Sequence, residues 1–233
     1  MDAGQQAGSS DREIRFAHTS VSELFPTLIW LADLAPDIFD PLNKAILDKL
    51  DTITGPRVQA YASETFQTEQ DLYHLREFAP LVHAIAKVVS GALRQLAIEA
   101  PEMAFSGMWA NINPPGAKHS VHSHPNNFLS GIYYIQCDPK ANVTRFFDPR
   151  PQAEVIMPPR AKQNVYNGNR IELDGKPGRI ALFPAWLKHD VPTNLSSRER
   201  ITVSFDLMFP RFTETMSMPL WRSGKNKGLR IRT

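Results

Sequence analysis

The chain has 233 residues, of which 42% are hydrophobic and 21% are charged, a composition typical of a globular protein of one or at most two domains. Its 26 basic and 24 acidic residues leave a net charge of +2, which argues against a dedicated nucleic-acid surface. The single cysteine, Cys137, excludes an intramolecular disulfide and a cysteine-rich zinc site. No apolar run approaches the roughly 20 residues that a membrane span requires.

The composition changes along the chain and predicts one domain with three regions. Residues 1–13 are expected to form a disordered tail, and since Met1 to Ser10 lack the basic and apolar parts of a signal peptide, we expect a cytoplasmic protein. Residues 14–102 are predicted to be a mainly helical support region. Residues 103–210 form a β-rich core, and residues 211–233 a C-terminal extension.

The helical region begins with an apolar run from Leu24 to Trp30 that favours a strand. From Asp37 to Leu50, apolar residues recur at i+4 steps, which predicts a helix that ends near Gly55. A second helix is predicted from Leu81 to Leu96, because apolar residues there follow the i, i+3, i+4 pattern over about four turns.

The β-rich core consists of short apolar runs separated by Pro, Gly and Asn, a pattern that predicts a sandwich or small barrel. The absence of strand–helix alternation argues against a parallel doubly wound sheet. The predicted strands are Gly107–Asn113, Leu129–Gln136, Val143–Phe147, Ala153–Met157, Asn164–Asn167, Arg170–Leu173, Arg179–Phe183 and Arg200–Phe209.

Three of the seven histidines lie within six residues, at His119, His122 and His124. On an extended backbone, His122 and His124 project from one face, because side chains alternate along a strand. A pair with this spacing also arises by chance, so it does not establish a metal site alone. His74 and His83, in the helical region, are interpreted as surface or packing residues.

A second candidate segment lies downstream, where His189 follows an apolar strand and a proline-containing turn, and Arg200 comes eleven residues later. A barrel brings such distant segments together at its mouth. Two or three imidazole or carboxylate ligands leave positions open on a non-haem iron(II) for oxygen and a chelating cosubstrate. An arginine can bind a carboxylate through two hydrogen bonds. These features together predict a metal site.

The motifs that carry a family likeness are Trp109-Ala-Asn-Ile-Asn, His122-Ser-His124-Pro, Leu129-Ser-Gly-Ile-Tyr-Tyr-Ile, Phe146-Phe-Asp-Pro-Arg150, Leu182-Phe-Pro-Ala-Trp-Leu-Lys-His189-Asp-Val and Arg200-Ile-Thr-Val-Ser-Phe. They resemble the 2-oxoglutarate/Fe(II)-dependent oxygenases over roughly residues 105–209. The resemblance implies an all-β core with N-terminal helices, folded as a double-stranded β-helix (jelly-roll, cupin-like). It also implies Fe(II) as cofactor and 2-oxoglutarate as cosubstrate.

The same resemblance assigns roles to four residues. His189 takes the place of the distal histidine ligand, and Arg200 that of the arginine that binds the C5 carboxylate of 2-oxoglutarate. Thr202 follows in an Arg-x-Ser/Thr pattern, and Tyr134 matches a tyrosine that prolyl hydroxylases use at that end. Alternatives remain: Arg198 could exchange roles with Arg200, and Thr202 and Tyr134 could be ordinary strand and packing residues.

The first ligand pair departs from the family pattern, because most members have His-x-Asp or His-x-Glu where this chain has His122-Ser-His124. Both histidines could bind the metal together with His189. Alternatively, His122 alone of the pair could bind it, and His124 would lie near the metal without binding it. In a third register, His124 is the proximal ligand and Asn126 stands at the carboxylate position. We favour the three-histidine site and interpret His119 as a loop residue near it.

For most of the other polar and aromatic residues near these motifs, a structural role is favoured over a role in the site. Asp148, in Phe-Phe-Asp-Pro-Arg, is better explained as a turn former than as a remote ligand. Asp190 would point away from His189 on an extended backbone. Trp109, Asn111 and Trp186 flank the expected mouth of the core, and for the two tryptophans packing is the favoured role.

The resemblance implies that O2 and 2-oxoglutarate are consumed to hydroxylate a small molecule, amino acid or peptide, with succinate and CO2 as coproducts. The alternative is a cupin-like metalloprotein, an isomerase, cysteine-dioxygenase-like enzyme or sensor, that does not use 2-oxoglutarate, since three histidines also suit zinc or nickel. A carboxylate clamp of Arg200, Tyr134 and Thr202 favours the oxygenase. An interaction module without activity is least favoured, because the His and Arg positions are intact.

No groove pattern in the sequence identifies the substrate. We expect neither a nucleic-acid nor a membrane partner. The sequence does not determine the oligomeric state, although the jelly-roll oxygenases that it resembles are often dimers, so a homodimer is one candidate assembly.

Overall fold

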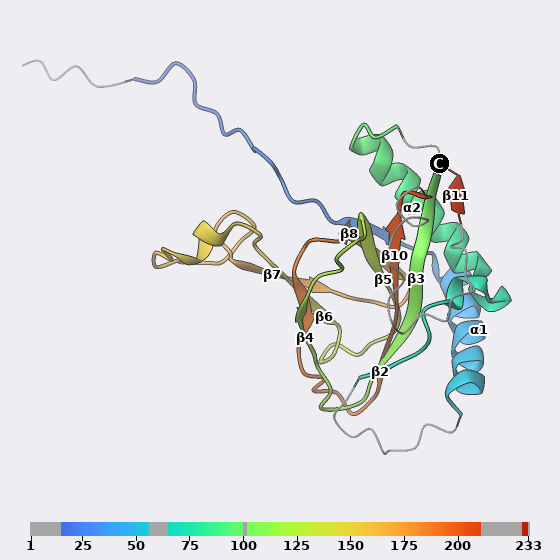
Figure 1. Ribbon diagram of the computed structural model, residues 1–233. Coiled ribbons are helices and arrows are strands. Elements are labelled where there is room, and N and C mark those ends of the chain that lie inside the picture. The colour runs from blue at the N-terminus through green and yellow to red at the C-terminus, as the bar shows by residue number, and fades with distance from the viewer. Residues whose placement is uncertain (1–14, 56–64, 100–101, 211–229, 233) are drawn as a thin grey trace, which may run out of the picture.

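The computed structural model describes residues 15–55, 65–99, 102–210 and 230–232, so the predicted tail and nearly all of the C-terminal extension lie outside the described residues. Two antiparallel sheets face each other, and helices α1 (Pro36–Thr54) and α2 (Ala79–Gln95) pack on the outer side of the larger sheet (Figure 1). This arrangement confirms the predicted β core with N-terminal helices. Within the described residues, neither helix is long and apolar enough to cross a lipid bilayer.

The larger sheet has the strand order β1-β8-β5-β10-β3-β11, and β2 pairs with β3. Its strands are β1 (Trp30–Asp33), β2 (Phe66–Gln67), β3 (Glu102–Asn113), β5 (Leu129–Gln136), β8 (Arg179–Pro184), β10 (Arg200–Met208) and β11 (Arg230–Arg232). The smaller sheet has the order β4-β9-β6-β7. It contains β4 (His119–His122), β6 (Val143–Phe147), β7 (Arg170–Asp174) and β9 (His189–Val191). Short 3-10 helices occupy Leu72–His74, Arg76–Phe78 and Pro151–Glu154.

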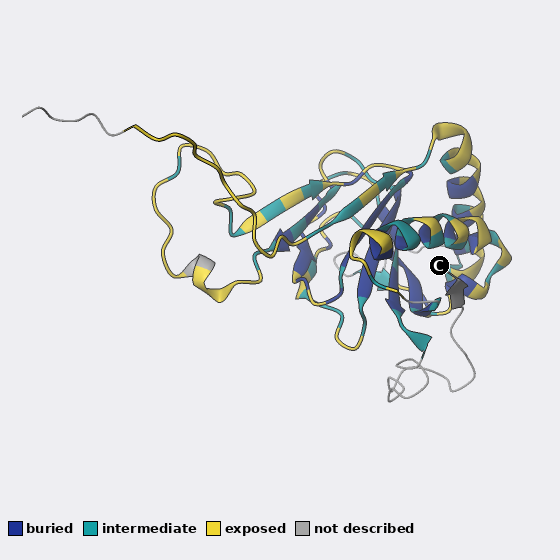
Figure 2. Cartoon of the chain, turned by 90° about the horizontal axis from the view of Figure 1, so that it is seen from above, coloured by how far each residue is buried: buried dark blue, intermediate teal, exposed yellow. Residues whose placement is uncertain are grey.

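Both predicted helices are confirmed. Helix α1 buries Leu42, Ile46 and Leu50 against the core, and it ends at Gly55, whose φ of 67° lies in the left-handed region that glycine tolerates. Helix α2 begins with a proline in its first turn, where the missing N–H costs no helical hydrogen bond. Its apolar stripe packs into the same core, as the dark blue segments of Figure 2 show.

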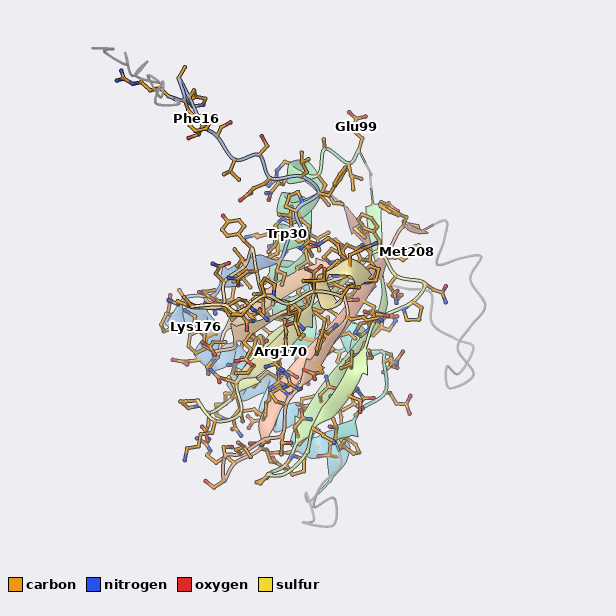
Figure 3. The ribbon with its side chains drawn as sticks, turned by 90° about the vertical axis from the view of Figure 1, so that its left-hand side faces the viewer. Phe16, Trp30, Glu99, Arg170, Lys176 and Met208 are labelled. Carbon is orange, nitrogen blue, oxygen red and sulfur yellow. The ribbon has the colours of Figure 1, made fainter. Side chains whose placement is uncertain are left out.

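The strand predicted at Leu24–Trp30 is wrong in position, because β1 begins only at Trp30. Phe25 has a φ of 56° and is almost fully exposed, so the chain bends there and pairs with no sheet. In Figure 3, Phe16 lies far out on this N-terminal segment, whereas Trp30 lies against the body of the protein. The Trp30 indole donates a hydrogen bond to Gln95 on α2, and this contact marks where the segment joins the fold.

Two predicted strands in the connection between β6 and β7 are also wrong. The apolar residues of the run Ala153–Met157 that the structure describes, Val155, Ile156 and Met157, are exposed and pair with no neighbouring strand. In Asn164–Asn167, the Asn164 side chain accepts hydrogen bonds from the backbone N–H groups of Tyr166 and Asn167, which closes a turn. The connection projects beyond the sheets (Figure 2).

Strand β10 lies at the centre of the larger sheet, between β3 and β5. Its residues at every second position carry polar side chains on one face, and antiparallel pairing aligns them with residues of the two neighbours. Thr202 faces Tyr134 on one side and Asn111 on the other, and Arg200 faces Asn113. This polar face of β10 is the floor of the candidate site.

An ion pair joins the edge strand β1 to β8. Arg179 lies opposite Asp33 in the sheet and donates to both carboxylate oxygens at 2.7 and 3.0 Å, and Lys176 adds a contact at 2.9 Å. The hydrogen bonds from Arg179 are the main reason why the pKa of Asp33 falls from 3.8 to about 2.

We expect Asp33→Asn to lower the free energy of unfolding by about 0.5–1 kcal/mol at neutral pH, a small effect because the pair is partly exposed. The folded pKa is depressed, so this contribution is present above about pH 4 and is lost as the pH falls towards 2. Urea unfolding of both proteins across this range measures it. A difference that stays constant with pH would contradict the ion-pair explanation.

Candidate metal centre

Three histidines from two strands and a loop converge in the space between the sheets. His122 on β4 lies directly opposite His189 on β9 in the smaller sheet. His124 follows β4 in a loop that is fixed by a hydrogen bond from its backbone N–H to the carbonyl of Ala185, at 2.9 Å. The ligand nitrogens of the three residues all lie within 4.8 Å of one another.

The Nδ1 atom of each of these histidines faces a group that can only accept a hydrogen bond. His122 Nδ1 lies 2.8 Å from the carbonyl oxygen of Ser120, and His189 Nδ1 lies 2.9 Å from that of Leu187. His124 Nδ1 lies 3.1 Å from the carboxylate of Asp206. Each Nδ1 therefore carries a proton, and Nε2 is the atom of each ring that is left to bind a metal ion.

The arrangement of the Nε2 atoms fits a bound cation. The Nε2 atoms of His124 and His189 lie 3.4 Å apart. If both rings carry a single proton on Nδ1, two lone pairs face each other there, and a metal ion between them would relieve the repulsion. Burial lowers the pKa of His189 to about 3 and also lowers that of His122, so the rings stay neutral at pH 7. Neutral imidazoles are good ligands for divalent transition metals.

Arg200 lies in the same cavity and carries a buried positive charge. Its Nη1 and Nη2 donate to the hydroxyls of Thr202 and Thr144 at 3.4 and 3.3 Å, and its guanidinium lies 5.4 Å from the centre of the Tyr134 ring. Its Nε is buried without a hydrogen-bond partner, and among the described residues no carboxylate pairs with it. Burial lowers the pKa of Arg200, although a guanidinium stays protonated.

The histidines and Arg200 line one cavity between the two sheets. Its other walls come from β3, β4, β5, β9 and β10 through Trp109, Asn111, Asn113, His119, Ile132, Val191, Thr202 and Ser204. A larger cavity of about 740 Å³ lies between α1 and the end of β5 and contains none of these histidines. We take the smaller cavity as the site, because there, within the part of the chain that the structure describes, three candidate ligand nitrogens and a buried guanidinium without a carboxylate partner lie together.

The structure brings all six predicted site residues to this region: His122, His124, His189, Arg200, Tyr134 and Thr202. His119 stacks on the His122 ring with 4.3 Å between centroids, and burial lowers its pKa to about 4. His119 therefore lies at the site wall, on β4, and not in a loop as predicted.

Several alternatives from the sequence do not reach the cavity. Asn126 is exposed in a turn, and Arg198 is directed towards Gln136 and Asp138 at the surface. Trp186 is more than half exposed and does not line the cavity, whereas Trp109 and Asn111 do.

Asp148 and Asp190, for which other roles than metal binding were favoured, form hydrogen bonds with arginines. Asp148 accepts a hydrogen bond from the backbone N–H of Arg150, as a turn former does. Asp190 pairs with Arg145.

Sequence reasoning missed two residues of the site. Thr144 on β6 is fully buried and contacts both Arg200 and the Tyr134 hydroxyl, the latter at 2.8 Å. Asp206 on β10 contacts His124. A signal for Asp206 was present, since Arg200, Thr202, Ser204 and Asp206 alternate with apolar residues and must share one face of the strand.

Comparisons with known proteins agree with this geometry. Residues 107–206 match the model of a family described as "Putative 2OG-Fe(II) oxygenase". A search of curated proteins found no match.

Solved structures with similar folds include EctD from S. alaskensis with 2-oxoglutarate and 5-hydroxyectoine. The two chains share 15% identity with a TM-score of 0.58, and the match covers 79% of this chain and 73% of that one. The carbocyclase SnoK from nogalamycin biosynthesis, described as α-ketoglutarate dependent, has 13% identity and a TM-score of 0.57, with 78% and 79% covered. A prolyl-4-hydroxylase from Pseudomonas putida has 14% identity and a TM-score of 0.52, with 78% and 92% covered.

These likenesses confirm the double-stranded β-helix fold, and the predicted cofactors, Fe(II) and 2-oxoglutarate, are those of the matching family. Residues 107–206 of the chain therefore carry the match to the 2-oxoglutarate/Fe(II) oxygenase family, and the fold of the chain is the one that solved oxygenases of this kind share.

Proposed function

We propose that the protein is a hydroxylase that holds Fe(II) through Nε2 of His122, His124 and His189 and binds the C5 carboxylate of 2-oxoglutarate through Arg200. The observation that carries this proposal is the pairing of two unsatisfied groups in one cavity. The Nε2 atoms of three histidines converge there, and a buried guanidinium that pairs with no carboxylate of the described residues lies in the same cavity. A metal ion chelated by a dicarboxylate would satisfy both.

The three-histidine set leaves room for the cosubstrate. Three neutral ligands leave the remaining positions of an octahedral Fe(II) open, and they leave its charge of +2 uncompensated. An anionic chelating ligand is favoured at such a centre, since it both fills open positions and reduces the charge. The neutral ligand set therefore supports the dianionic 2-oxoglutarate as the cosubstrate over an uncharged molecule.

The carboxylate clamp is built from residues on three strands. Arg200 and Thr202 lie on β10, Tyr134 on β5 and Thr144 on β6. The hydroxyls of Tyr134 and Thr144 lie 2.8 Å apart, and Thr144 also receives a hydrogen bond from Arg200. A carboxylate that enters would pair with the guanidinium, and these hydroxyls would add neutral donors.

Fe(II) and 2-oxoglutarate, when bound, would supply the oxidising chemistry together with O2: one oxygen atom would enter the C–H bond of the substrate and the other would enter succinate as 2-oxoglutarate loses CO2. The chain's own residues bind and orient. The histidines fix the metal position, Arg200 fixes the far end of the cosubstrate, and the apolar side chains of Ile132 and Val191 in the cavity wall limit access of water. Hydroxylation as the outcome is supported by the fold likeness to the prolyl-4-hydroxylase.

A cupin-like metalloprotein that does not use 2-oxoglutarate remains the alternative function. Such a protein would need the histidines and not the buried cation. Arg200 therefore separates the two functions, and substitutions there test the choice.

We expect Arg200→Met to weaken 2-oxoglutarate binding by about 30-fold or more, because removing one partner of a buried charge pair costs about 2–5 kcal/mol. The metal-free protein should lose no stability, since the substitution removes an unpaired buried charge. Anaerobic titration of the Fe(II) protein, followed by its charge-transfer absorption, measures the affinity. Arg198→Met is the matched control, because it removes the same charge two residues away at the surface. Equal affinity in both variants would exclude the clamp.

We expect His122→Ala, His124→Ala and His189→Ala each to weaken Fe(II) binding more than about 100-fold. Loss of a group that only hydrogen-bonds to a metal ligand already lowers metal affinity about 10–100-fold, and loss of the ligand itself should lower it further. Metal content after gel filtration and calorimetric titration measure this loss. His83→Ala, at an exposed position of α2, should retain full binding. Full iron content in His122→Ala would disprove the three-histidine centre.

The position of Tyr134 depends on Gly175, because a Cβ at residue 175 would lie 2.1 Å from the Tyr134 ring. We expect Gly175→Ala to displace the ring and weaken 2-oxoglutarate binding about 10-fold while Fe(II) binding persists. The loss of one hydrogen bond between uncharged groups lowers a binding affinity by about this factor. Gly91→Ala on α2 is the control, because its nearest contact would be 3.9 Å away. Unchanged 2-oxoglutarate affinity in Gly175→Ala would remove Tyr134 from the clamp.

A further inference from the structure

We propose that Asp206 is a positioning residue of the metal centre: its carboxylate holds His124 in the Nδ1–H form and supplies the negative charge that the ligand set lacks. This inference rests on the proposed Fe(II) site. It concerns how the site is held and charged, and it makes Asp206 neither a ligand nor a group that contacts the substrate.

The contacts of Asp206 are specific and buried. Both of its carboxylate oxygens lie 3.1 Å from His124 Nδ1, and Oδ1 also accepts a hydrogen bond from the Ser130 hydroxyl at 2.6 Å. Ser130 on β5 lies opposite Asp206 in the sheet, so the pairing of β5 with β10 fixes this contact. The side chains of His124 and Asp206 are 12% and 11% exposed, so water competes little for the hydrogen bond.

The geometry explains why Asp206 is not itself a ligand. Its carboxylate lies on the Nδ1 side of the His124 ring, whereas Nε2 on the other side of the ring faces His189. The imidazole therefore stands between the carboxylate and the metal position. Asp206 orients the ring and makes it a stronger donor, as carboxylates behind metal-bound histidines do.

Asp206 is the one charged partner among the three Nδ1 contacts. His122 and His189 donate to the backbone carbonyls of Ser120 and Leu187, which fix the tautomer and add no net charge. The Asp206 carboxylate lies one imidazole ring away from the metal position, so it reduces the positive charge of the centre without binding the ion.

A buried aspartate could also serve packing alone, so the test must report on the ring of His124. We expect histidine ¹⁵N spectra of the metal-free wild type to show His124 as the Nδ1–H tautomer. In Asp206→Ala this preference should be lost, because no acceptor remains beside Nδ1. The spectra need neither metal nor activity, and thermal unfolding of each variant shows whether it is folded.

Metal binding supplies the second readout, with Co(II) as the probe. We expect Asp206→Asn, which keeps the shape and an acceptor oxygen, to weaken Co(II) binding about 10–100-fold and to alter the Co(II) absorption bands. Asp190→Asn is the matched control, since it removes a buried carboxylate next to His189 that pairs with Arg145 and contacts none of the three rings. This control should bind Co(II) as the wild type does.

The outcomes separate this inference from the proposed function. If the wild type binds Co(II) tightly and the Asp206 variants bind it equally well, with the His124 tautomer unchanged, Asp206 has only a packing role and the inference is wrong. If the wild type does not bind Co(II) at the histidines, the metal centre and the inference fall together. Loss of affinity in Asp206→Asn with no loss in Asp190→Asn supports both.

Discussion

The site depends on one constraint: the Nδ1 atom of each of three histidines is committed to an acceptor. Two of these acceptors are backbone carbonyls, of Ser120 and Leu187, and the third is the Asp206 carboxylate. Because the protons are held at the far side of the rings, the Nε2 lone pairs have to meet in the interior. Such an arrangement is unfavourable when empty and favourable around a cation. The hydrogen bonds at the three Nδ1 atoms therefore favour the binding of a metal ion at the three Nε2 atoms.

The other half of the site, around Arg200, favours an anion in the same way that the histidines favour a cation. Arg200 is buried at the start of β10, and neutral hydroxyls and the Tyr134 ring surround it instead of a carboxylate. A buried cation without a partner costs stability, and the fold retains it where an anion can bind. Since β10 carries both Arg200 and Asp206, one strand would position the proposed anion clamp at one end and support the proposed metal centre at the other.

Much of this could be predicted from the sequence, where the signal was local. The helices followed from apolar periodicity, and His122, His124, His189 and Arg200 followed from spacing and family resemblance. Predictions failed where apolar residues lacked a partner strand: Ile156 and Phe25 are β-favouring but exposed, because strand formation requires a neighbour that the sequence does not identify. The support of His124 by Asp206 joins residues 82 positions apart, so only strand register reveals it.

The most direct test of this account is a crystal structure of the protein with Fe(II) and 2-oxoglutarate, prepared without oxygen and with anomalous scattering to locate the iron. We expect iron bound by the Nε2 atoms of His122, His124 and His189, with the distal carboxylate of 2-oxoglutarate on Arg200. Iron bound directly by Asp206, iron outside the cavity between the sheets, or 2-oxoglutarate without contact to Arg200 would contradict it.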